Sequence, residues 1–147
     1  MVEALLLAGE AAEHNEVPVG AVIAMAGKII GRGRNRMEEL CCATAHAEML
    51  AIQEASHALG SWRLNESVLV VTLEPCTMCA GAIVNARIPT VVFATREPNT
   101  GALRSLFDVT LSAPPAQRPR IIEGIMENES RSALQRFFLQ RRTDERA

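Results

Sequence analysis

The sequence lacks the long apolar segments, repeats and excess of one charge that would place it in several common classes. No apolar run in the 147 residues approaches the roughly 18 that a membrane-spanning helix needs. Residues 1–14 have neither the basic flank nor the small-residue cleavage site of a signal peptide. The 15 basic and 17 acidic residues give a net charge of −2, which argues against a globally basic nucleic-acid binder. We expect one domain, residues 1–147, that does not enter a membrane.

Cysteine and lysine are also scarce. The four cysteines form two close pairs, Cys41-Cys42 and Cys76/Cys79, whereas a disulfide framework spaces its cysteines across loops. Reduced thiols and a cytoplasmic location are therefore expected. Lys28 is the only lysine, and all other basic residues are arginines. A compositional bias explains this preference for arginine more simply than phosphate recognition does. A chain of this length buries roughly 70% of its unfolded surface, so a metal would be free to act in chemistry rather than in folding.

The pattern of apolar residues and turn signals alternates strands with helices. Helices are predicted over residues 2–14, 45–59, 76–86 and 127–142, a β-hairpin over 20–25 and 28–31, and strands over 67–73, 90–94 and 121–122. Thr44 is the expected N-cap of the second helix, and Pro75 is expected in the first turn of the third. This alternation predicts an α/β protein with helices on both faces of a mixed sheet.

Two short segments at predicted helix starts carry groups that suit metal chemistry. Cys76 and Cys79 are three residues apart and so face the same way from a first helical turn, where the helix dipole favours thiolates. His46 supplies an imidazole from the other helix start. One imidazole and two thiolates suit Zn²⁺ and leave the fourth tetrahedral position open, as in catalytic sites.

Glu48 makes this interpretation more specific. A carboxylate close to a metal-activated water can take up a proton and return it to a leaving group. The simpler alternative treats Glu48 as a first-turn acid favoured by the helix dipole and His46 as a capping residue. Each segment alone leaves the two interpretations about equal. Their joint occurrence strongly favours the metal site.

The joint pattern His-x-Glu followed by Pro-Cys-x-x-Cys resembles the signature of the zinc-dependent nucleoside and nucleobase deaminases. The wider sequence is similar to bacterial tRNA-specific adenosine deaminases of the cytidine/deoxycytidylate deaminase superfamily, from about residue 3 to residue 142. The similar segments are residues 16–22, 33–36, 44–49, 72–82 and 100–102.

This resemblance implies a three-layer α/β/α sandwich with a central mixed sheet of about five strands, a homodimer, and a tRNA anticodon stem-loop as partner. It implies hydrolytic deamination of adenosine to inosine at the wobble position, in which a zinc-activated hydroxide attacks C6 of adenine and ammonia leaves. Residue by residue, the resemblance implies that His46, Cys76 and Cys79 bind one Zn²⁺ per subunit and that Glu48 is the proton shuttle. The residues expected to hold the target nucleoside are Asn35, Val17, Pro18, Val19 and Ala47.

The departures from the family pattern lie away from these zinc and shuttle residues. The family's Asp-Pro-Thr is replaced by Cys42-Ala43-Thr44, an Asp and a Lys by Glu97 and Asn99, and an Asn-His pair by Ala116-Gln117. All three bear on how RNA is held. Cys41 or Cys42 could also supply a fourth zinc ligand, but two ordinary small loop residues are the simpler interpretation.

The C-terminal segment 131–142 contains four arginines and no acid. We expect Arg141 and Arg142 to contact RNA phosphates and Phe138 to offer a stacking face, with Leu134 and one phenylalanine in the core. An ordinary amphipathic closing helix is the alternative. Two other functions remain open from the sequence: a zinc deaminase of a free base or nucleoside of the guanine or cytosine type, and a non-catalytic binding module stabilised by zinc.

Overall fold

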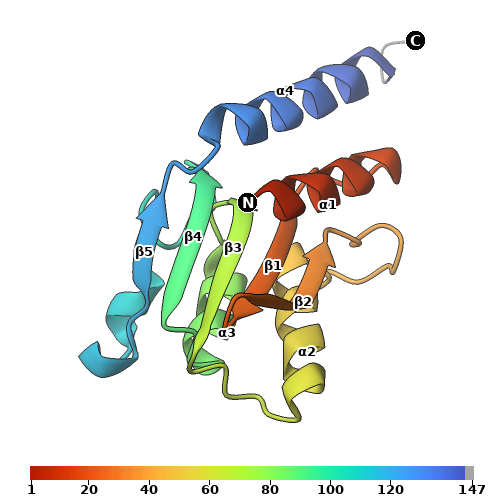
Figure 1. The fold of residues 1–147 in the computed structure, drawn as a ribbon. Coiled ribbons are helices and arrows are strands. Elements are labelled where there is room, and N and C mark those ends of the chain that lie inside the picture. The colour runs from red at the N-terminus through yellow and green to blue at the C-terminus, as the bar shows by residue number, and fades with distance from the viewer. Residues whose placement is uncertain (145–147) are drawn as a thin grey trace.

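A computed structural model describes residues 1–144 as four α-helices and a five-stranded sheet (Figure 1). The sheet has the order β2-β1-β3-β4-β5. Strands β1 and β2 form an antiparallel hairpin, β1 also pairs antiparallel with β3, and β3, β4 and β5 run parallel. The elements are α1 (Val2–Glu13), β1 (Gly20–Met25), β2 (Lys28–Arg34), α2 (Ala47–Leu59), β3 (Ser67–Leu73), α3 (Thr77–Asn85), β4 (Thr90–Thr95), β5 (Arg120–Glu123) and α4 (Glu127–Asp144).

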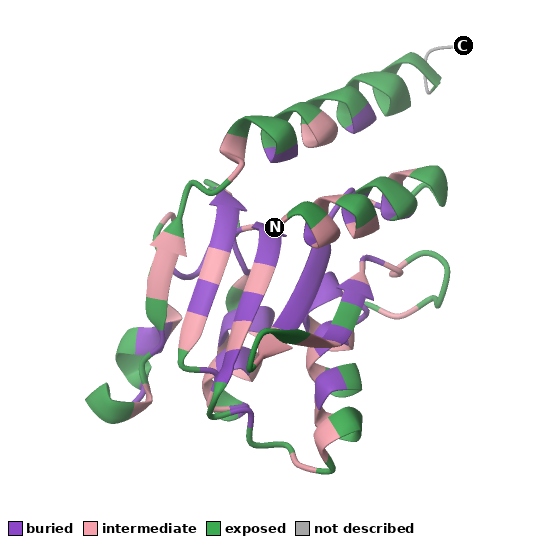
Figure 2. Cartoon of the chain, viewed as in Figure 1, coloured by how far each residue is buried: buried purple, intermediate pink, exposed green. Residues whose placement is uncertain are grey.

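Helices cover both faces of the sheet, with α1 and α4 on one face and α2 and α3 on the other (Figure 1). The central strands β1, β3 and β4 carry most of the buried positions (Figure 2). Leu69, Val71, Val91 and Phe93 are fully buried within this core. The predicted three-layer α/β/α architecture with a mixed five-stranded sheet is therefore confirmed.

The predicted starts of the second and third helices were wrong by one or two residues. Helix α2 begins at Ala47 with His46 as N-cap, so Thr44 does not cap it, and the Thr44 hydroxyl instead lies 3.3 Å from the Cys42 sulfur. Helix α3 begins at Thr77 with Cys76 as N-cap, which leaves Pro75 ahead of the first turn. Both capping residues have extended backbone angles. Neither side chain caps its helix by a hydrogen bond, so both are available to form a binding site at the helix starts.

Helix α2 lies unusually close to β2 because two glycines of the strand face it. A Cβ atom at Gly33 would lie 2.0 Å from the carbonyl oxygen of Ala47, and one at Gly31 would lie 2.3 Å from that of Ala51. Both distances are far below van der Waals contact, and in each case the neighbour is backbone that cannot rotate away. The first turn of α2, which carries Glu48, is thus set by the absence of a side chain at Gly33.

We expect Gly33→Ala to lower the free energy of unfolding by about 1–3 kcal/mol, because the added methyl group pushes α2 away from the sheet. Urea denaturation monitored by circular dichroism measures the change. Gly81→Ala is the matched control, since a Cβ there meets no atom within 4 Å and alanine favours a helix interior. Equal stability of Gly33→Ala and the wild-type protein would contradict the close packing.

Candidate active site

Three side chains that could bind a metal ion converge where the starts of α2 and α3 meet. His46 and Cys76 are the N-caps of the two helices, and Cys79 follows within the first turn of α3. Nδ1 of His46 lies 3.7 Å from the Cys76 sulfur and 3.6 Å from the Cys79 sulfur. All three potential ligand atoms lie within 4.8 Å of one another. The structure therefore brings together the three ligands that the sequence predicted.

The spacing of these atoms fits a tetrahedral zinc ion. With Zn–S of about 2.3 Å and Zn–N of about 2.0 Å, sulfur and nitrogen ligands lie about 3.6 Å apart, as the two His46 contacts do. Neither Cys41 nor Cys42 joins the group: the Cys41 sulfur lies near the Glu38 carbonyl and the Cys42 sulfur near Thr44. Among the described residues 1–144, this group has three protein ligands, the number typical of catalytic zinc sites.

The two thiols already share their charge unequally. A hydrogen bond from Cys79 holds the pKa of the Cys76 thiol far below its usual range, at about 3, although burial opposes this. The same hydrogen bond, together with burial, raises the pKa of Cys79. Of the two sulfurs, that of Cys76 is thus the one favoured as a thiolate. A metal that takes both sulfurs as thiolates displaces the remaining proton, so metal binding and proton release are coupled.

Glu48 is a buried acid in the first turn of α2, close to the three candidate metal ligands. Its exposed fraction is 4%. Burial raises the pKa of Glu48 to about 7, against opposing contributions from a backbone hydrogen bond and the nearby His46. A carboxyl group with a pKa near neutrality can both accept and donate a proton at physiological pH. This is the behaviour that a proton shuttle requires.

A cavity of about 230 Å³ opens onto His46, Glu48 and Cys76. Asn35, at the end of β2, is 6% exposed and held by a hydrogen bond from its backbone N–H to the Val19 carbonyl, 3.0 Å long. Its side chain lines the cavity. The cavity is smaller than pockets for drug-sized ligands, and its size suits a single flat ring system. The complete lining is Val17, Val19, Asn35, Met37, His46, Glu48, Leu73, Glu74, Cys76, Glu97 and Thr100.

Two residues predicted to contact substrate do not line this cavity. Val17 and Val19 face it, but the intervening Pro18 points away and lines a separate cavity between α1 and α4. Neighbouring residues of extended chain point to opposite sides, which explains this result. Ala47 is fully buried in the core, where its carbonyl approaches β2.

The sequence prediction missed five lining residues. Leu73 and Glu74 directly precede the Pro-Cys-x-x-Cys segment, so proximity to the ligands was an available signal. Glu97 and Thr100 lie in the loop after β4, where the sequence indicated Glu97 as a departure from the family pattern and residues 100–102 as a similar segment, without assigning either residue to the site. No local signal pointed to Met37. It lies in the loop after β2 and lines the cavity only through the folding of that loop.

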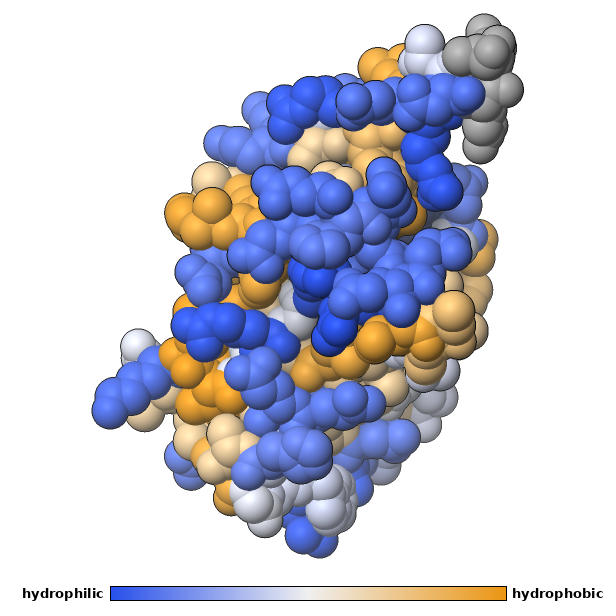
Figure 3. Space-filling model, turned by 90° about the vertical axis from the view of Figure 1, so that its right-hand side faces the viewer, coloured by the Kyte–Doolittle hydropathy of each residue, from blue (hydrophilic) through white to orange (hydrophobic). Residues whose placement is uncertain are grey.

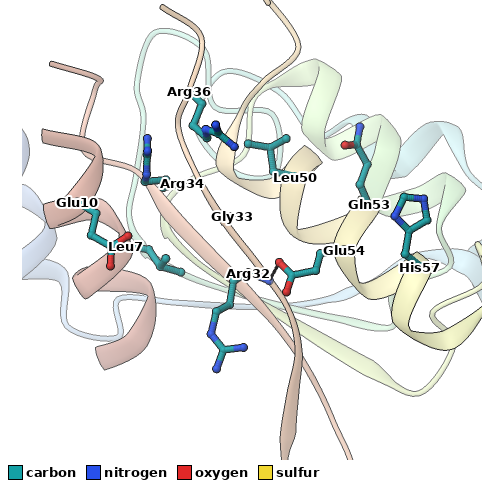
Figure 4. A pocket seen from close by; sticks show the side chains of 10 residues that line it. All are labelled: Leu7, Glu10, Arg32, Gly33, Arg34, Arg36, Leu50, Gln53, Glu54 and His57. Carbon is teal, nitrogen blue, oxygen red and sulfur yellow. Dashed lines mark hydrogen bonds between the residues drawn. The ribbon is translucent and has the colours of Figure 1, made fainter. Parts of the chain in front are cut away.

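A larger cavity of about 440 Å³ lies on the β2 side of the sheet and contains none of the metal ligands. Hydrophilic residues predominate on this side of the molecule (Figure 3). Helix α1, β2, the loop after β2 and α2 supply the lining residues, which include three arginines (Figure 4). Arg32 pairs with Glu3, and Arg34 and Arg36 both pair with Glu39. Because these charges are already partnered, we assign no ligand to this cavity.

The residues expected to contact RNA lie on α4. Arg141 and Arg142 are exposed, and the Arg141 guanidinium lies 5.5 Å from the centre of the Phe137 ring. Phe137 is buried, whereas Phe138 is 43% exposed and so has a free edge. Leu134 is half-buried. One phenylalanine thus belongs to the core and the other is accessible, as expected.

No described helix is long and apolar enough to cross a membrane.

Comparison with known sequences identifies close relatives. The sequence model of the MafB19-like deaminase family matches residues 1–142. The tRNA-specific adenosine deaminase of Bacillus subtilis (strain 168) is 42% identical, over 100% of this chain and 91% of the relative. That of Agrobacterium fabrum is 43% identical, over 97% and 93%. A chloroplastic tRNA(adenine(34)) deaminase of Arabidopsis thaliana is 46% identical over 94% of this chain, which spans only 12% of that protein's length.

Two solved structures are informative. One, from a study of A-to-I editing by tRNA:A34 deaminases at the wobble position of transfer RNA, has a TM-score of 0.84 and 43% identity over 91% of this chain and 97% of its own. A guanine deaminase from Bacillus subtilis has a TM-score of 0.63 and 32% identity over 92% and 90%.

The fold, the three-residue group able to hold a metal and the buried carboxyl group are those of a deaminase, and the chain belongs to the MafB19-like deaminase family. Within that family it belongs to the tRNA-specific adenosine deaminases, to which its near-full-length relatives and its structural neighbour are assigned. The family membership and enzyme class expected from the sequence are confirmed.

Proposed function

We propose that this chain hydrolyses adenosine to inosine at the wobble position of a tRNA anticodon. Adenosine and water are converted to inosine and ammonia: a C–O bond forms at C6 of the adenine ring and the bond from C6 to the amino nitrogen breaks. The observation that carries the proposal is the position of Glu48, a buried acid that lines a small cavity together with His46 and Cys76, two of the three residues that could hold a metal ion. A purely structural metal site has no use for such a carboxyl group.

The proposed cofactor is one zinc ion per subunit, bound by His46, Cys76 and Cys79. When bound, zinc supplies Lewis acidity that activates water as a nucleophile at neutral pH. The chain itself moves the protons. As a carboxylate, Glu48 accepts one proton from the attacking water and, as a carboxylic acid, donates it to the purine ring nitrogen. It then accepts the second proton of that water from the new C6 hydroxyl and donates it to the departing amine, which leaves as ammonia. Its raised pKa keeps both forms accessible.

The target base is proposed to lie against Val17 and Val19, with the side-chain amide of Asn35 hydrogen-bonding to the nucleoside. An amide offers two donors and an acceptor, and so matches the mixed donor and acceptor edges of a nucleoside. To reach this cavity, the nucleotide must be extruded from the anticodon loop, as for other enzymes that act on bases. Arg141, Arg142 and Phe138 on α4 are proposed to contact the flanking RNA.

Asn35→Ala is expected to lower kcat/KM for tRNA about 3- to 10-fold, which corresponds to the loss of one net hydrogen bond. Inosine formation over a range of tRNA concentrations measures this. Asn65→Ala, an exposed asparagine of the loop before β3, is the control and should behave as wild type. An Asn35→Ala protein with unaltered kcat/KM would remove Asn35 from the substrate site.

A homodimer and a cytoplasmic location are also proposed. The dimer follows from the resemblance of nearly the whole chain to its family, and the location from four free thiols, two of them metal ligands, which a reducing compartment preserves. Light scattering coupled to size-exclusion chromatography tests the dimer, for which we expect twice the mass of a single chain.

A free-base deaminase is the second candidate, because the guanine deaminase of Bacillus subtilis shares the fold. The test compares zinc-loaded protein on tRNA carrying adenosine at the wobble position, on the same tRNA with guanosine there, and on free adenosine, guanine and cytosine. We expect inosine in the first tRNA alone. Conversion of guanine with no inosine in tRNA would establish the second candidate, and zinc-loaded protein inert on every substrate would indicate a binding module.

A further inference from the structure

Glu74 is a buried carboxylate beside the metal ligands that the proposed chemistry does not use. It lies between β3 and Cys76, and its exposed fraction is 3%. A buried carboxyl group is costly unless its oxygens are hydrogen-bonded, so the partners of Glu74 indicate its purpose.

Every partner of the Glu74 carboxylate comes from one loop, which follows β4. Oε1 accepts hydrogen bonds from the backbone N–H groups of Leu103, Arg104 and Ser105, at 3.2, 2.6 and 2.9 Å. Oε2 accepts from the N–H of Glu97, at 3.1 Å, and from the Ser105 hydroxyl. We call residues 97–105 the wall loop. A single side chain thus gathers both ends of the wall loop around itself.

The centre of the wall loop is closed around the same carboxylate. A Cβ atom at Gly101 would lie 2.5 Å from the carboxyl carbon of Glu74, so the carboxylate occupies the space that a side chain would need. The backbone then joins the loop to the metal-ligand segment. The N–H of Ala102 donates to the Pro75 carbonyl over 2.9 Å, and Gly101 forms a β-bridge with Cys76.

The wall loop forms part of the site cavity through Glu97 and Thr100. These two side chains come from neither metal-bearing helix. Their position relative to Glu48 and His46 therefore depends on whatever holds the loop, and the five hydrogen bonds to Glu74 are its main polar anchor. Removal of that anchor changes the cavity wall while the residues that perform the chemistry stay in place.

We propose that Glu74 is a positioning residue for substrate binding: it holds the wall loop so that Glu97 and Thr100 form the side of the cavity that receives the RNA nucleotide. This inference rests on the proposed tRNA substrate. It separates Glu74 from Glu48, because Glu74 sets how well substrate binds and Glu48 sets how fast bound substrate reacts.

Glu74→Gln tests this assignment, because glutamine keeps the shape but replaces one acceptor oxygen with an NH₂ group that faces N–H donors. We expect KM for tRNA to rise about tenfold or more, kcat to change less than threefold, and zinc content to remain that of the wild type. Hydrogen–deuterium exchange at the amides of residues 97–105 should become faster. Glu123→Gln is the matched control: its exposed carboxylate pairs with Arg96 at the start of the same connection, so KM should not change.

A second variant keeps the test decisive if Glu74→Gln does not fold. Ser105→Ala removes one of the five donors, and we expect a two- to fivefold rise in KM with faster exchange in the wall loop. Wild-type KM in both variants would overturn the assignment. A fall in kcat that accompanies loss of zinc would overturn it too, since Glu74 would then act through Cys76. A wild-type protein inactive on tRNA would refute the proposed function instead, and the exchange measurement would still report on the wall loop.

Discussion

Replacement of Glu48 by glutamine is expected to lower kcat by about 10²- to 10⁴-fold, the range that general acid–base catalysis contributes. Glutamine has the size of glutamate but can neither accept nor return the proton. Because Glu48 is not one of the three ligands, zinc content should be unchanged. Glu48→Ala should also retain zinc and lose turnover. Single-turnover formation of inosine, with zinc measured by mass spectrometry, gives both quantities.

Glu54→Gln provides the control for this experiment. Glu54 lies on the same helix, is exposed and accepts a hydrogen bond from the Arg32 N–H, so its replacement should leave kcat within twofold of wild type. Substantial turnover by a zinc-replete Glu48→Gln protein would show that another group moves the proton, and the assigned role of Glu48 would fail.

Replacement of Cys79 by alanine is expected to reduce bound zinc from one per chain to nearly none and to abolish activity. Cys79 is fully buried and contributes one of only three ligands, so no nearby described group can substitute for its sulfur. Because bound metal stabilises the folded state, chelation should lower the melting temperature of the wild-type protein but not that of the variant. Zinc analysis and thermal denaturation with and without chelator measure these effects.

Cys42→Ser is the matched control for Cys79→Ala. The Cys42 sulfur contacts Thr44 and lies outside the metal group, so this variant should bind zinc and turn over as wild type does. Zinc loss in Cys42→Ser would show instead that Cys42 is a fourth ligand. The fourth coordination position of the proposed zinc ion would then be occupied by a protein side chain rather than by water.

The parts of the fold and site that could be predicted from sequence are those determined over short distances. The strand over residues 67–73 was predicted with its observed bounds because its apolar run is continuous. The sequence could single out His46, Cys76, Cys79 and Glu48 as candidates because each lies at or near a helix start, where residue type and spacing carry the information. The predicted helix starts differ from the observed ones because His46 and Cys76 have extended backbone angles, which the capping preferences of the residues do not reveal.

The parts that could not be predicted depend on contacts between distant residues. The bonds from Glu74 to the wall loop span 23 to 31 positions, and no periodicity connects an acid after β3 with amides that follow β4. Pro18 and Ala47 were expected at the substrate site from the resemblance of their segments to the family. In the structure Pro18 lines a separate cavity and Ala47 lies in the core, and these directions depend on the folded backbone rather than on the local sequence.

The layer formed by α1 and α4 supplies none of the metal ligands, all of which come from the opposite side of the sheet. The RNA contacts that we propose for α4 would therefore lie on the opposite side of the sheet from the residues proposed to perform the chemistry. An engineer could exchange α4, with its exposed arginines, for a different docking helix and retarget the enzyme without rebuilding its reactive centre. Substitutions in α4 should accordingly alter contacts with the flanking RNA while the reactive centre stays unchanged.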